Sequence, residues 1–526
     1  MLTEDSVKKF VLWNPFDQNA SAGFFDREWM FGLTEGFDIV IGNPPYVRHE
    51  GIQDQKPDLK KIYTCYTGTA DLYVYFYERS IRLLKPYGAF AFITSNRWYR
   101  SNYGKELRQW MNQNTFLRRI IDFGDAPVFD AMAYPTIVIA QRRPKVVTEP
   151  GEEEIVLALN WDTNMPVETF PEVFAEHACP VPQRELKVTG WQIEKPYKRE
   201  ILTKMKAAGT PLFIWCNRKI YAGIKTGLNE AFIVDGPAKD AMLRDHPDSA
   251  PLFVPCLRGR DVKRWHVKEE DYWLIKIESS ENVPHPWSGL PELEAWQNFA
   301  ALHPSVALHF EQLMPGLQDR LDQGTYYWEL RSCGFWPEFA EPKVFMPAIE
   351  KAAMYAPITG EYYGNNKTHF VVTDEWDFLS AVLNSEVSWW FTQQVFTTKQ
   401  GGYYEFIPQF VGQIPIPPAD ENQKALIRTI VKILLVSPDN VASWEQLLNG
   451  LVYELYFPDD LHSNGIRLFD ELERLNILSK DNTQSVASVE AGRAIAQMIS
   501  SNDHPVYRML FDLQGLEIVR IIEGKV

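Results

Sequence analysis

The chain has 526 residues, of which 45% are hydrophobic and 13% aromatic, so it can bury large cores in about two to four domains. No apolar run reaches the length of a membrane span, and residues 1–9 lack the features of a signal peptide, which predicts a cytoplasmic protein. Five cysteines without a Cys-x-x-Cys pair and ten histidines without a His-Glu-x-x-His spacing argue against a disulfide framework and a metal site. The formal net charge of -16 describes only the average surface, so a nucleic-acid partner is not excluded.

Residues 37–46 read Phe-Asp-Ile-Val-Ile-Gly-Asn-Pro-Pro-Tyr, a buried-strand pattern that leads directly into Asn43, Pro44, Pro45 and Tyr46. The two prolines keep this segment out of a helix. The Asn43 side chain and the Pro44 carbonyl can accept the two N–H bonds of an aromatic amine, while the Tyr46 ring lies against the base. The tetrapeptide is expected by chance only about once in a thousand chains of this length. The structural alternative is a Pro-rich turn after a core strand.

From Phe37 to Gln141, short apolar segments alternate with amphipathic ones, which predicts an α/β domain over residues 1–145. The expected strands are 37–41, 88–94, 119–123 and 136–140, and the expected helices are 71–84 and 103–113. Ligands of such parallel sheets bind at the carboxyl ends of the strands, where Asn43 falls. Residues 146–209 begin with a segment rich in Pro and Glu and are expected to be a connector.

Residues 210–420 contain short aromatic and β-branched runs broken by Gly, Pro and Asn, such as 273–277 and 343–346, and should form a mixed, strand-rich domain. Residues 421–526 show apolar spacings of three and four, which predict a helical region. The helices expected there are 422–436, 442–455, 466–475 and 485–500.

Two basic clusters stand out against the acidic average. Residues 97–119 contain six basic side chains and one acid, and residues 258–268 contain five basic side chains and one acid. Either cluster contacts phosphates or is an ordinary solvated face.

The chain resembles the amino-methylating DNA methyltransferases of the TaqI-like group, in particular the larger restriction-modification proteins with a TaqI-like C-terminal specificity domain. The resemblance is carried by Asn43 to Tyr46, by residues 71–76 (Asp-Leu-Tyr-Val-Tyr-Phe) and by residues 81–86 (Ile-Arg-Leu-Leu-Lys-Pro). Further along, residues 219–229, 257–262, 365–367 and 383–385 are similar to parts of that specificity domain. The resemblance implies a partial Rossmann-like methyltransferase sheet, a target-recognition domain over 210–420, and adenine-N6 methylation of a flipped base in double-stranded DNA, with S-adenosylmethionine as the cofactor.

The same resemblance assigns roles to individual residues. Phe129 is expected to stack on the other face of the flipped base, with a core position as the alternative. Asn43, Pro45, Asp71, Phe76 and Asp17 are expected near the cofactor, with a helix N-cap as the alternative for Asp71 and a turn as the alternative for Asp17. The basic clusters and the specificity-domain segments add the expected DNA contacts, which are Arg97, Arg100, Lys225, Asn229, Arg258, Arg260 and Lys263.

In the family, a Gly-rich strand and loop and an acidic ribose-binding strand end precede the Asn-Pro-Pro-Tyr segment, but only 42 residues precede Asn43 here. The resemblance therefore implies an N-terminally incomplete methyltransferase that needs an N-terminal fragment or subunit and binds S-adenosylmethionine poorly alone. The alternatives are a noncatalytic DNA-specificity subunit, or a methyltransferase acting on cytosine N4, RNA or a protein amide. Asn rather than Ser at position 43 favours adenine by resemblance.

Overall fold

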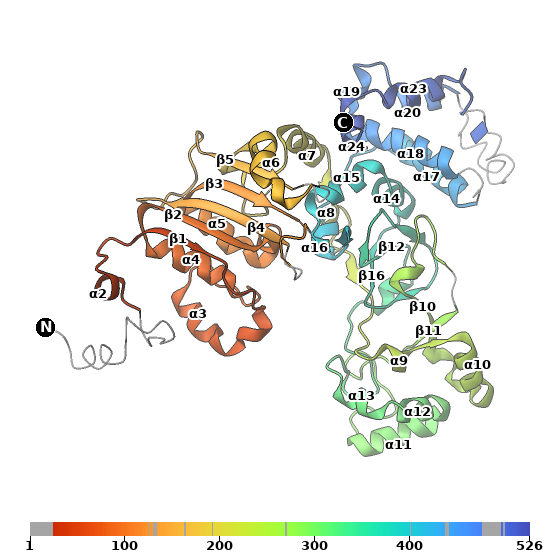
Figure 1. Cartoon of the computed structure of the whole chain (residues 1–526). Helices are drawn as coiled ribbons and strands as arrows, with labels where there is room; N and C mark the ends of the chain where they lie inside the picture. The colour runs from red at the N-terminus through yellow and green to blue at the C-terminus, as the bar shows by residue number, and fades with distance from the viewer. Residues whose placement is uncertain are drawn as a thin grey trace, which may run out of the picture. The chain divides into compact units, whose positions relative to one another are not determined.

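The computed structural model describes residues 25–124, 126–129, 134–161, 165–191, 193–268, 271–399, 401–436, 441–475, 496–497 and 500–525. The chain divides into two compact units, Met1–Pro196 and Tyr197–Val526 (Figure 1). Each unit is described by itself.

Unit 1 is built on a six-stranded mixed sheet with the order β1-β2-β4-β3-β5-β6. Strand β1 pairs in parallel with β2, and β3 pairs in parallel with β5, whereas β4 is antiparallel to both β2 and β3. All four strands expected before residue 145 are present, although the antiparallel β4 was not anticipated. The strands are β1 (Phe37–Gly42), β2 (Leu84–Ser95), β3 (Thr115–Asp122), β4 (Pro135–Arg142), β5 (Ile155–Asn160) and β6 (Cys179–Pro182).

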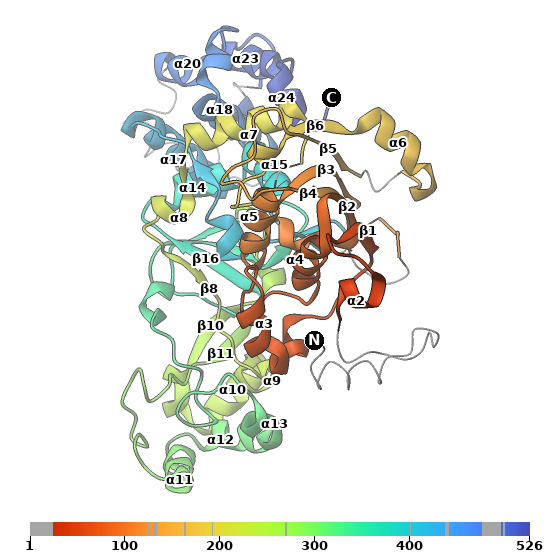
Figure 2. The same cartoon turned by 90° about the vertical axis from the view of Figure 1, so that its left-hand side faces the viewer.

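Helices α4 (Tyr73–Leu83) and α5 (Lys105–Asn114) cover one face of this sheet (Figures 1 and 2). Their buried side chains join those of alternate strand residues, such as Phe90 and Val138, in one hydrophobic core. On the opposite face, α6 (Phe170–His177) packs beside the ends of β3 and β5. Two short helices, α2 (Arg27–Phe31) and α3 (Lys56–Ile62), flank β1 in the sequence.

Residues 146–209, expected to be a connector, contain the last two strands of the sheet, helix α6 and helix α7 (Pro196–Ala208). Strand β5 joins the sheet because it pairs in parallel with β3, with Ala158 opposite Ile120, and buries Val156 and Ala158 completely. The strand was not predicted because the acidic residues directly before it are typical of a connector.

Unit 2 contains two four-stranded sheets, ordered β15-β10-β11-β9 and β14-β12-β16-β8, as well as smaller pairings. Helices α11 (Glu292–Leu302), α12 (Pro304–Glu311), α13 (Met314–Asp319), α14 (Trp376–Leu383) and α15 (Glu386–Val395) interrupt the strand-rich region and were not expected. The strands are β7 (Thr210–Pro211), β8 (Ile220–Ala222), β9 (Ile233–Asp235), β10 (Phe253–Leu257), β11 (Tyr272–Ile275), β12 (Lys343–Pro347), β13 (Ile349–Glu350), β14 (Ala356–Ile358), β15 (Tyr363–Gly364), β16 (Thr368–Val372), β17 (Thr398–Lys399), β18 (Tyr403–Glu405) and β19 (Pro415–Ile416). The short helices are α8 (Leu212–Trp215), α9 (Asn229–Phe232), α10 (Gly236–Asp245) and α16 (Pro408–Val411).

The C-terminal part of unit 2 is helical, as expected. It contains α17 (Glu421–Val436), α18 (Val441–Tyr456), α19 (Pro458–His462), α20 (Leu468–Leu475), α23 (Pro505–Leu513) and α24 (Glu517–Ile522). Most of the helix expected at 485–500 lies outside the described residues. Within the described residues, no helix is long and apolar enough to span a bilayer.

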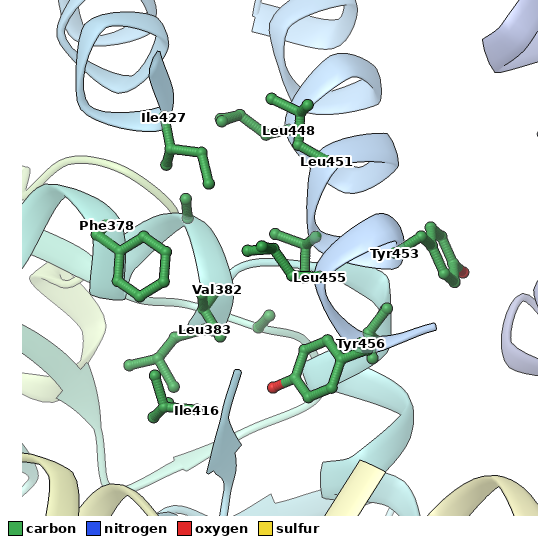
Figure 3. Close-up of a cluster of buried hydrophobic side chains, with 14 of the residues drawn as sticks. Phe378, Val382, Leu383, Ile416, Ile427, Leu448, Leu451, Tyr453, Leu455 and Tyr456 are labelled. Atoms are coloured by element: carbon green, nitrogen blue, oxygen red, sulfur yellow. The ribbon is translucent and has the colours of Figure 1, made fainter. Parts of the chain in front are cut away.

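One hydrophobic core joins these helices to α14 and to strand β19 (Figure 3). Phe378 and Val382 of α14, Leu451 and Tyr456 of α18, and Ile416 of β19 are all buried in this core. The Tyr456 hydroxyl also donates a hydrogen bond to the Pro415 carbonyl. The helical region therefore packs directly on the strand-rich part of the unit.

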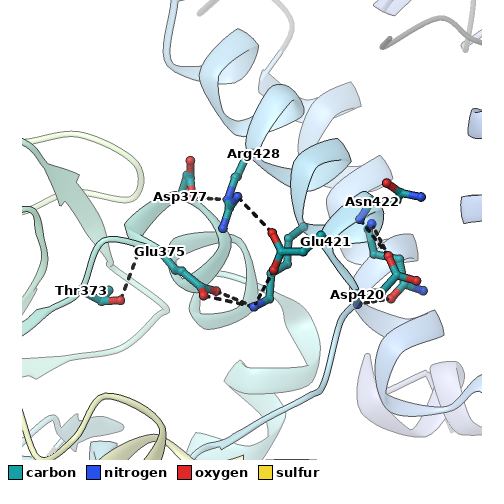
Figure 4. A network of polar contacts seen from close by, with 9 residues as sticks. Thr373, Glu375, Asp377, Asp420, Glu421, Asn422 and Arg428 are labelled. Carbon is teal, nitrogen blue, oxygen red and sulfur yellow. Dashed lines mark hydrogen bonds and ion pairs between the residues drawn. The ribbon is translucent and has the colours of Figure 1, made fainter. Parts of the chain in front are cut away.

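A polar network at the start of α17 supports the same contact (Figure 4). Lys424 Nζ lies 3.0 Å from a carboxylate oxygen of Glu375, and Arg428 Nε lies 3.5 Å from Asp377. Both acids lie at the start of α14, so the two ion pairs connect α14 and α17.

We expect Leu451→Ala to lower the free energy of unfolding of unit 2 by about 2–5 kcal/mol, because the side chain is fully buried and its removal leaves a cavity. Leu435→Ala, at a residue 37% exposed on α17, is the matched control and should cost about 1 kcal/mol or less. Urea denaturation followed by tryptophan fluorescence measures both, and equal losses would contradict this assignment of the core.

Candidate active site and specificity segments

The Asn43–Tyr46 segment follows β1 at the carboxyl end of the parallel β1–β2 pair. Gly42 lies opposite Phe92, and a Cβ at position 42 would come within 3.1 Å of the Phe92 ring. The side chains of Asn43, Pro45 and Tyr46 are exposed, whereas Pro44 is buried. The segment is thus anchored through Pro44, and the polar and aromatic groups beside it remain accessible to a ligand.

Tyr46 is held by two contacts. Its hydroxyl donates a hydrogen bond of 3.3 Å to the Ile93 carbonyl of β2, and its ring meets the Tyr73 ring edge-on, with centroids 6.3 Å apart. Burial raises the pKa of the Tyr46 phenol, so the hydroxyl stays protonated and remains a donor at neutral pH. The ring orientation is therefore fixed by β2 and α4, while 36% of the residue stays exposed.

Asp71 connects the start of α4 to the chain that follows Tyr46. Its Oδ1 accepts a hydrogen bond from the His49 amide at 3.1 Å, and the Leu72 amide donates to the Val47 carbonyl at 2.9 Å. The N-cap residue of α4 is Leu72, so Asp71 does not cap this helix. Burial raises the pKa of the Asp71 carboxyl, with the His49 hydrogen bond and the Arg97 charge acting in the opposite direction.

The other residues expected in unit 1 lie on neighbouring segments. Phe76 is 39% exposed on α4, and Phe129 is half-buried between β3 and β4. Arg97 follows β2, and its guanidinium carbon lies 5.9 Å from the centre of the Tyr134 ring; Arg100 is half-buried nearby in the sequence. Asp17 lies outside the described residues.

Three segments of unit 2 that the sequence singled out separately are hydrogen-bonded together. The Ile224 amide donates to the Gly364 carbonyl at 2.6 Å, and the Asn365 amide donates to the Leu257 carbonyl at 2.9 Å. A Cβ at Gly259 would lie 2.5 Å from the Lys367 carbonyl oxygen, so only glycine fits this close approach. Residues 219–229, 257–262 and 365–367 therefore form one surface region, which adds the exposed Lys367 to the candidate DNA contacts.

The basic side chains expected to contact DNA differ in how they are held. Arg258 forms a two-bond ion pair with Asp261, with both distances 2.9 Å, and its guanidinium carbon lies 3.5 Å from the centre of the Tyr272 ring. Lys225 pairs with Asp322 at 3.2 Å and remains 61% exposed.

The remaining expected contacts lie close to these two in the sequence. Asn229 accepts a hydrogen bond from the Thr226 hydroxyl at 2.7 Å. Arg260 is exposed and Lys263 is half-buried. Within the described part of the chain, no group of three or more His, Cys, Asp or Glu side chains is placed to hold a metal ion.

Two family models match the two parts of this arrangement. Residues 3–129 match the Eco57I restriction-modification methylase model, and residues 254–416 match the TaqI-like C-terminal specificity domain. The chain is also similar to the type II methyltransferase M.PaeR7I of Pseudomonas aeruginosa, with 28% identity over 76% of this chain and 69% of the relative. M.XhoI of Xanthomonas vasicola is 25% identical over 84% of this chain and 79% of the relative. Both parts of the chain are therefore similar to restriction-modification DNA methyltransferases.

Among solved structures, the type IIL restriction-modification enzyme MmeI, determined in complex with DNA, has a similar fold, with a TM-score of 0.51 and 12% identity. The match covers 85% of this chain and 57% of the MmeI chain. This methyltransferase thus spans a little over half the length of MmeI, and the similarity supports the fold assignment alone.

We expect Asp71→Asn to stabilise this methyltransferase increasingly as the pH rises from about 4 to about 8. The folded-state pKa of Asp71 lies above that of the unfolded chain, so the contribution of its carboxyl to stability is fully present only below the unfolded pKa and is lost as the pH rises through the folded pKa. Asparagine keeps the acceptor for His49 without the buried charge. Urea denaturation across this range measures the trend, with the exposed Asp54→Asn as the control, and a flat difference would contradict it.

Proposed function

We propose that this methyltransferase transfers a methyl group from S-adenosylmethionine to N6 of an adenine that is flipped out of double-stranded DNA. The observation that carries the proposal is the exposure of Asn43, Pro45 and Tyr46 at the carboxyl end of β1, with the Tyr46 ring fixed against β2. A binding site at the carboxyl ends of the strands is the usual arrangement in open α/β sheets.

The Asn43 side-chain oxygen and the Pro44 carbonyl accept the two N–H bonds of the adenine amine and orient its nitrogen for attack. Catalysis then comes mainly from positioning and from the arrangement of these dipoles. Tyr46 stacks on one face of the base and Phe129 on the other. Each stacking contact is worth about 1–3 kcal/mol, which offsets the few kcal/mol that flipping a base costs.

The residues that would hold the cofactor surround the same segment. Asn43 and Pro45 are exposed beside it, Phe76 presents an exposed ring on α4, and Asp71 is half-buried at the start of that helix. The cofactor supplies an electrophilic methyl group when bound. Within the described residues, these side chains supply an apolar surface and acceptors to one side of it.

Among the described residues, β1 is the outermost strand of its sheet, and this edge supports an N-terminal fragment or subunit as the source of the other side of the cofactor site. Strand β1 lies at the end of the sheet, and Ile39 and Ile41, on the face opposite α4, are 65% and 79% exposed. Parallel strands with exposed apolar residues are normally paired and covered. We assign this edge to a strand of an N-terminal fragment or subunit that carries the Gly-rich loop and the acidic strand end.

Duplex DNA is the proposed substrate, because the TaqI-like specificity domain supplies a surface region with exposed cations. Lys225, Arg260 and Lys367 project from its three joined segments. Arg258 and Asn229 lie in the same segments, Lys263 directly follows one of them, and Arg97 and Arg100 follow β2 close to the proposed active site. Contacts of this kind to phosphates position a duplex, and base contacts select the sequence.

Asn43→Ala should lower methyl transfer about 100-fold or more, because one of the two amine acceptors is lost. The assay combines the chain with a fragment carrying a Gly-rich methyltransferase strand and loop, unmethylated phage DNA and labelled S-adenosylmethionine. Mass spectrometry of the nucleosides identifies the product. The exposed Asn102→Ala is the matched control and should keep the activity of the natural chain.

The nature of the product decides between the functions considered. N6-methyladenine supports the proposal, and N4-methylcytosine would replace the substrate base. DNA binding without any methylation, by the natural chain and by Asn43→Ala alike, would indicate a noncatalytic specificity subunit. Methylation of RNA or of protein amides but not of duplex DNA would overturn the proposed substrate.

Ile41→Lys should weaken binding of the Gly-rich fragment about tenfold or more, because a charged side chain would be buried when a strand and its helix cover this face. Ile155→Lys, at a residue 42% exposed near the other edge of the same sheet, is the matched control and should bind the fragment normally. Isothermal titration measures both, and equal affinities would contradict the assignment of the β1 edge.

A further inference from the structure

Asn96 and Asp122 join the carboxyl ends of β2 and β3. Asn96 directly follows β2, and its side-chain amide donates to both carboxylate oxygens of Asp122, at 2.8 and 3.1 Å. Asp122 is the last residue of β3, and its main-chain carbonyl accepts a hydrogen bond of 2.7 Å from the Trp161 amide after β5.

The same two residues hold both ends of the segment that carries Phe129. At its start, the Gly124 amide donates to Asp122 Oδ1 at 3.0 Å, and at its end the Asn96 amide donates to the Tyr134 carbonyl at 2.9 Å. Gly124 and Tyr134 both have positive φ angles, +56° and +46°. A tyrosine rarely adopts this conformation unless its surroundings impose it, so the end of the segment is firmly determined.

The other proposed stacking residue is attached to the same stretch of β2. Tyr46 donates to the carbonyl of Ile93, three residues before Asn96. Both aromatic residues therefore depend on the last residues of β2, one through a direct hydrogen bond and one through the Asn96–Asp122 pair.

We propose that Asn96 and Asp122 are positioning residues that set the spacing between the Tyr46 and Phe129 rings, and hence the fit of the flipped base. The inference rests on the proposed function. A carboxylate suits position 122 because it accepts several hydrogen bonds at once. An amide suits position 96 because its side chain donates to that carboxylate, while the main-chain N–H of Asn96 donates to the Tyr134 carbonyl. Neither residue touches the reacting atoms in this role.

The test compares the natural chain with Asn96→Ala, Asp122→Ala and the exchanged pair Asn96→Asp with Asp122→Asn. The exchanged pair restores an amide-to-carboxylate hydrogen bond in the opposite direction and leaves an acceptor for the Gly124 amide. Hydrogen exchange of peptides covering residues 123–134 reports on the segment. Steady-state methylation of unmethylated phage DNA, with the Gly-rich fragment present, reports on the site.

Each alanine variant should speed exchange in this segment about tenfold and lower kcat about tenfold, with KM for DNA unchanged. The exchanged pair should recover both quantities to within about threefold of the natural chain. A loss of kcat that the exchanged pair does not recover, or exchange rates equal to those of the natural chain, would overturn the positioning role. If the natural chain itself does not methylate DNA, the proposed function fails and the positioning role fails with it, whatever the exchange rates are.

Discussion

The parallel pairing of β1 with β2 is the constraint on which the proposed active site depends. Parallel neighbours end at the same edge of a sheet, so Asn43 and Tyr46 after β1 come beside Ile93 and Asn96 at the end of β2. The antiparallel β4 then returns between β2 and β3 and starts at the same edge, which brings the Phe129 segment to it. Three stretches of sequence thus meet at one edge because of strand direction, and the Tyr46 and Asn96–Asp122 hydrogen bonds fix their distances.

Much of unit 1 could be predicted because its signals are local. Strand β1 and the Asn43–Tyr46 segment are contiguous in sequence, and helices α4 and α5 show a clear apolar periodicity. Strand β5 was missed because its residues pair with residues of β3 that lie 38 positions earlier, such as Ile120 opposite Ala158, and a six-residue strand behind an acidic run has no local signal of that pairing. The Asn96–Asp122 bond is equally nonlocal, since nothing near either residue indicates the other.

Unit 2 was harder to predict because its aromatic residues serve helices as well as strands. Trp296 and Phe299 of α11 pack against Trp328 in a cluster of rings, whereas aromatic-rich sequence favours strands by propensity. Family resemblance assigned residues 219–229, 257–262 and 365–367 to the same specificity domain. Their contacts, however, depend on backbone hydrogen bonds between β-segments more than 100 residues apart. Composition carries no information about such contacts.

The candidate DNA contacts differ in the ion pairs that their side chains already make, and therefore in the free-energy cost of moving each cation to a phosphate. Lys225 is 61% exposed, and its partner Asp322, which is 13% exposed, also pairs with Arg331 at 3.3 Å. Moving Lys225 to a phosphate therefore leaves Asp322 paired and costs little. Arg258 is 13% exposed and its partner Asp261 2%, so releasing Arg258 would leave a buried carboxylate unpaired, at a cost of about 3–5 kcal/mol. Arg258 is therefore better suited to shaping the segment that presents Arg260 than to reading bases itself. In a chain with a net charge of -16, long-range attraction to DNA is weak, so affinity must come from a few exposed cations such as Lys225, Arg260 and Lys367 placed close together.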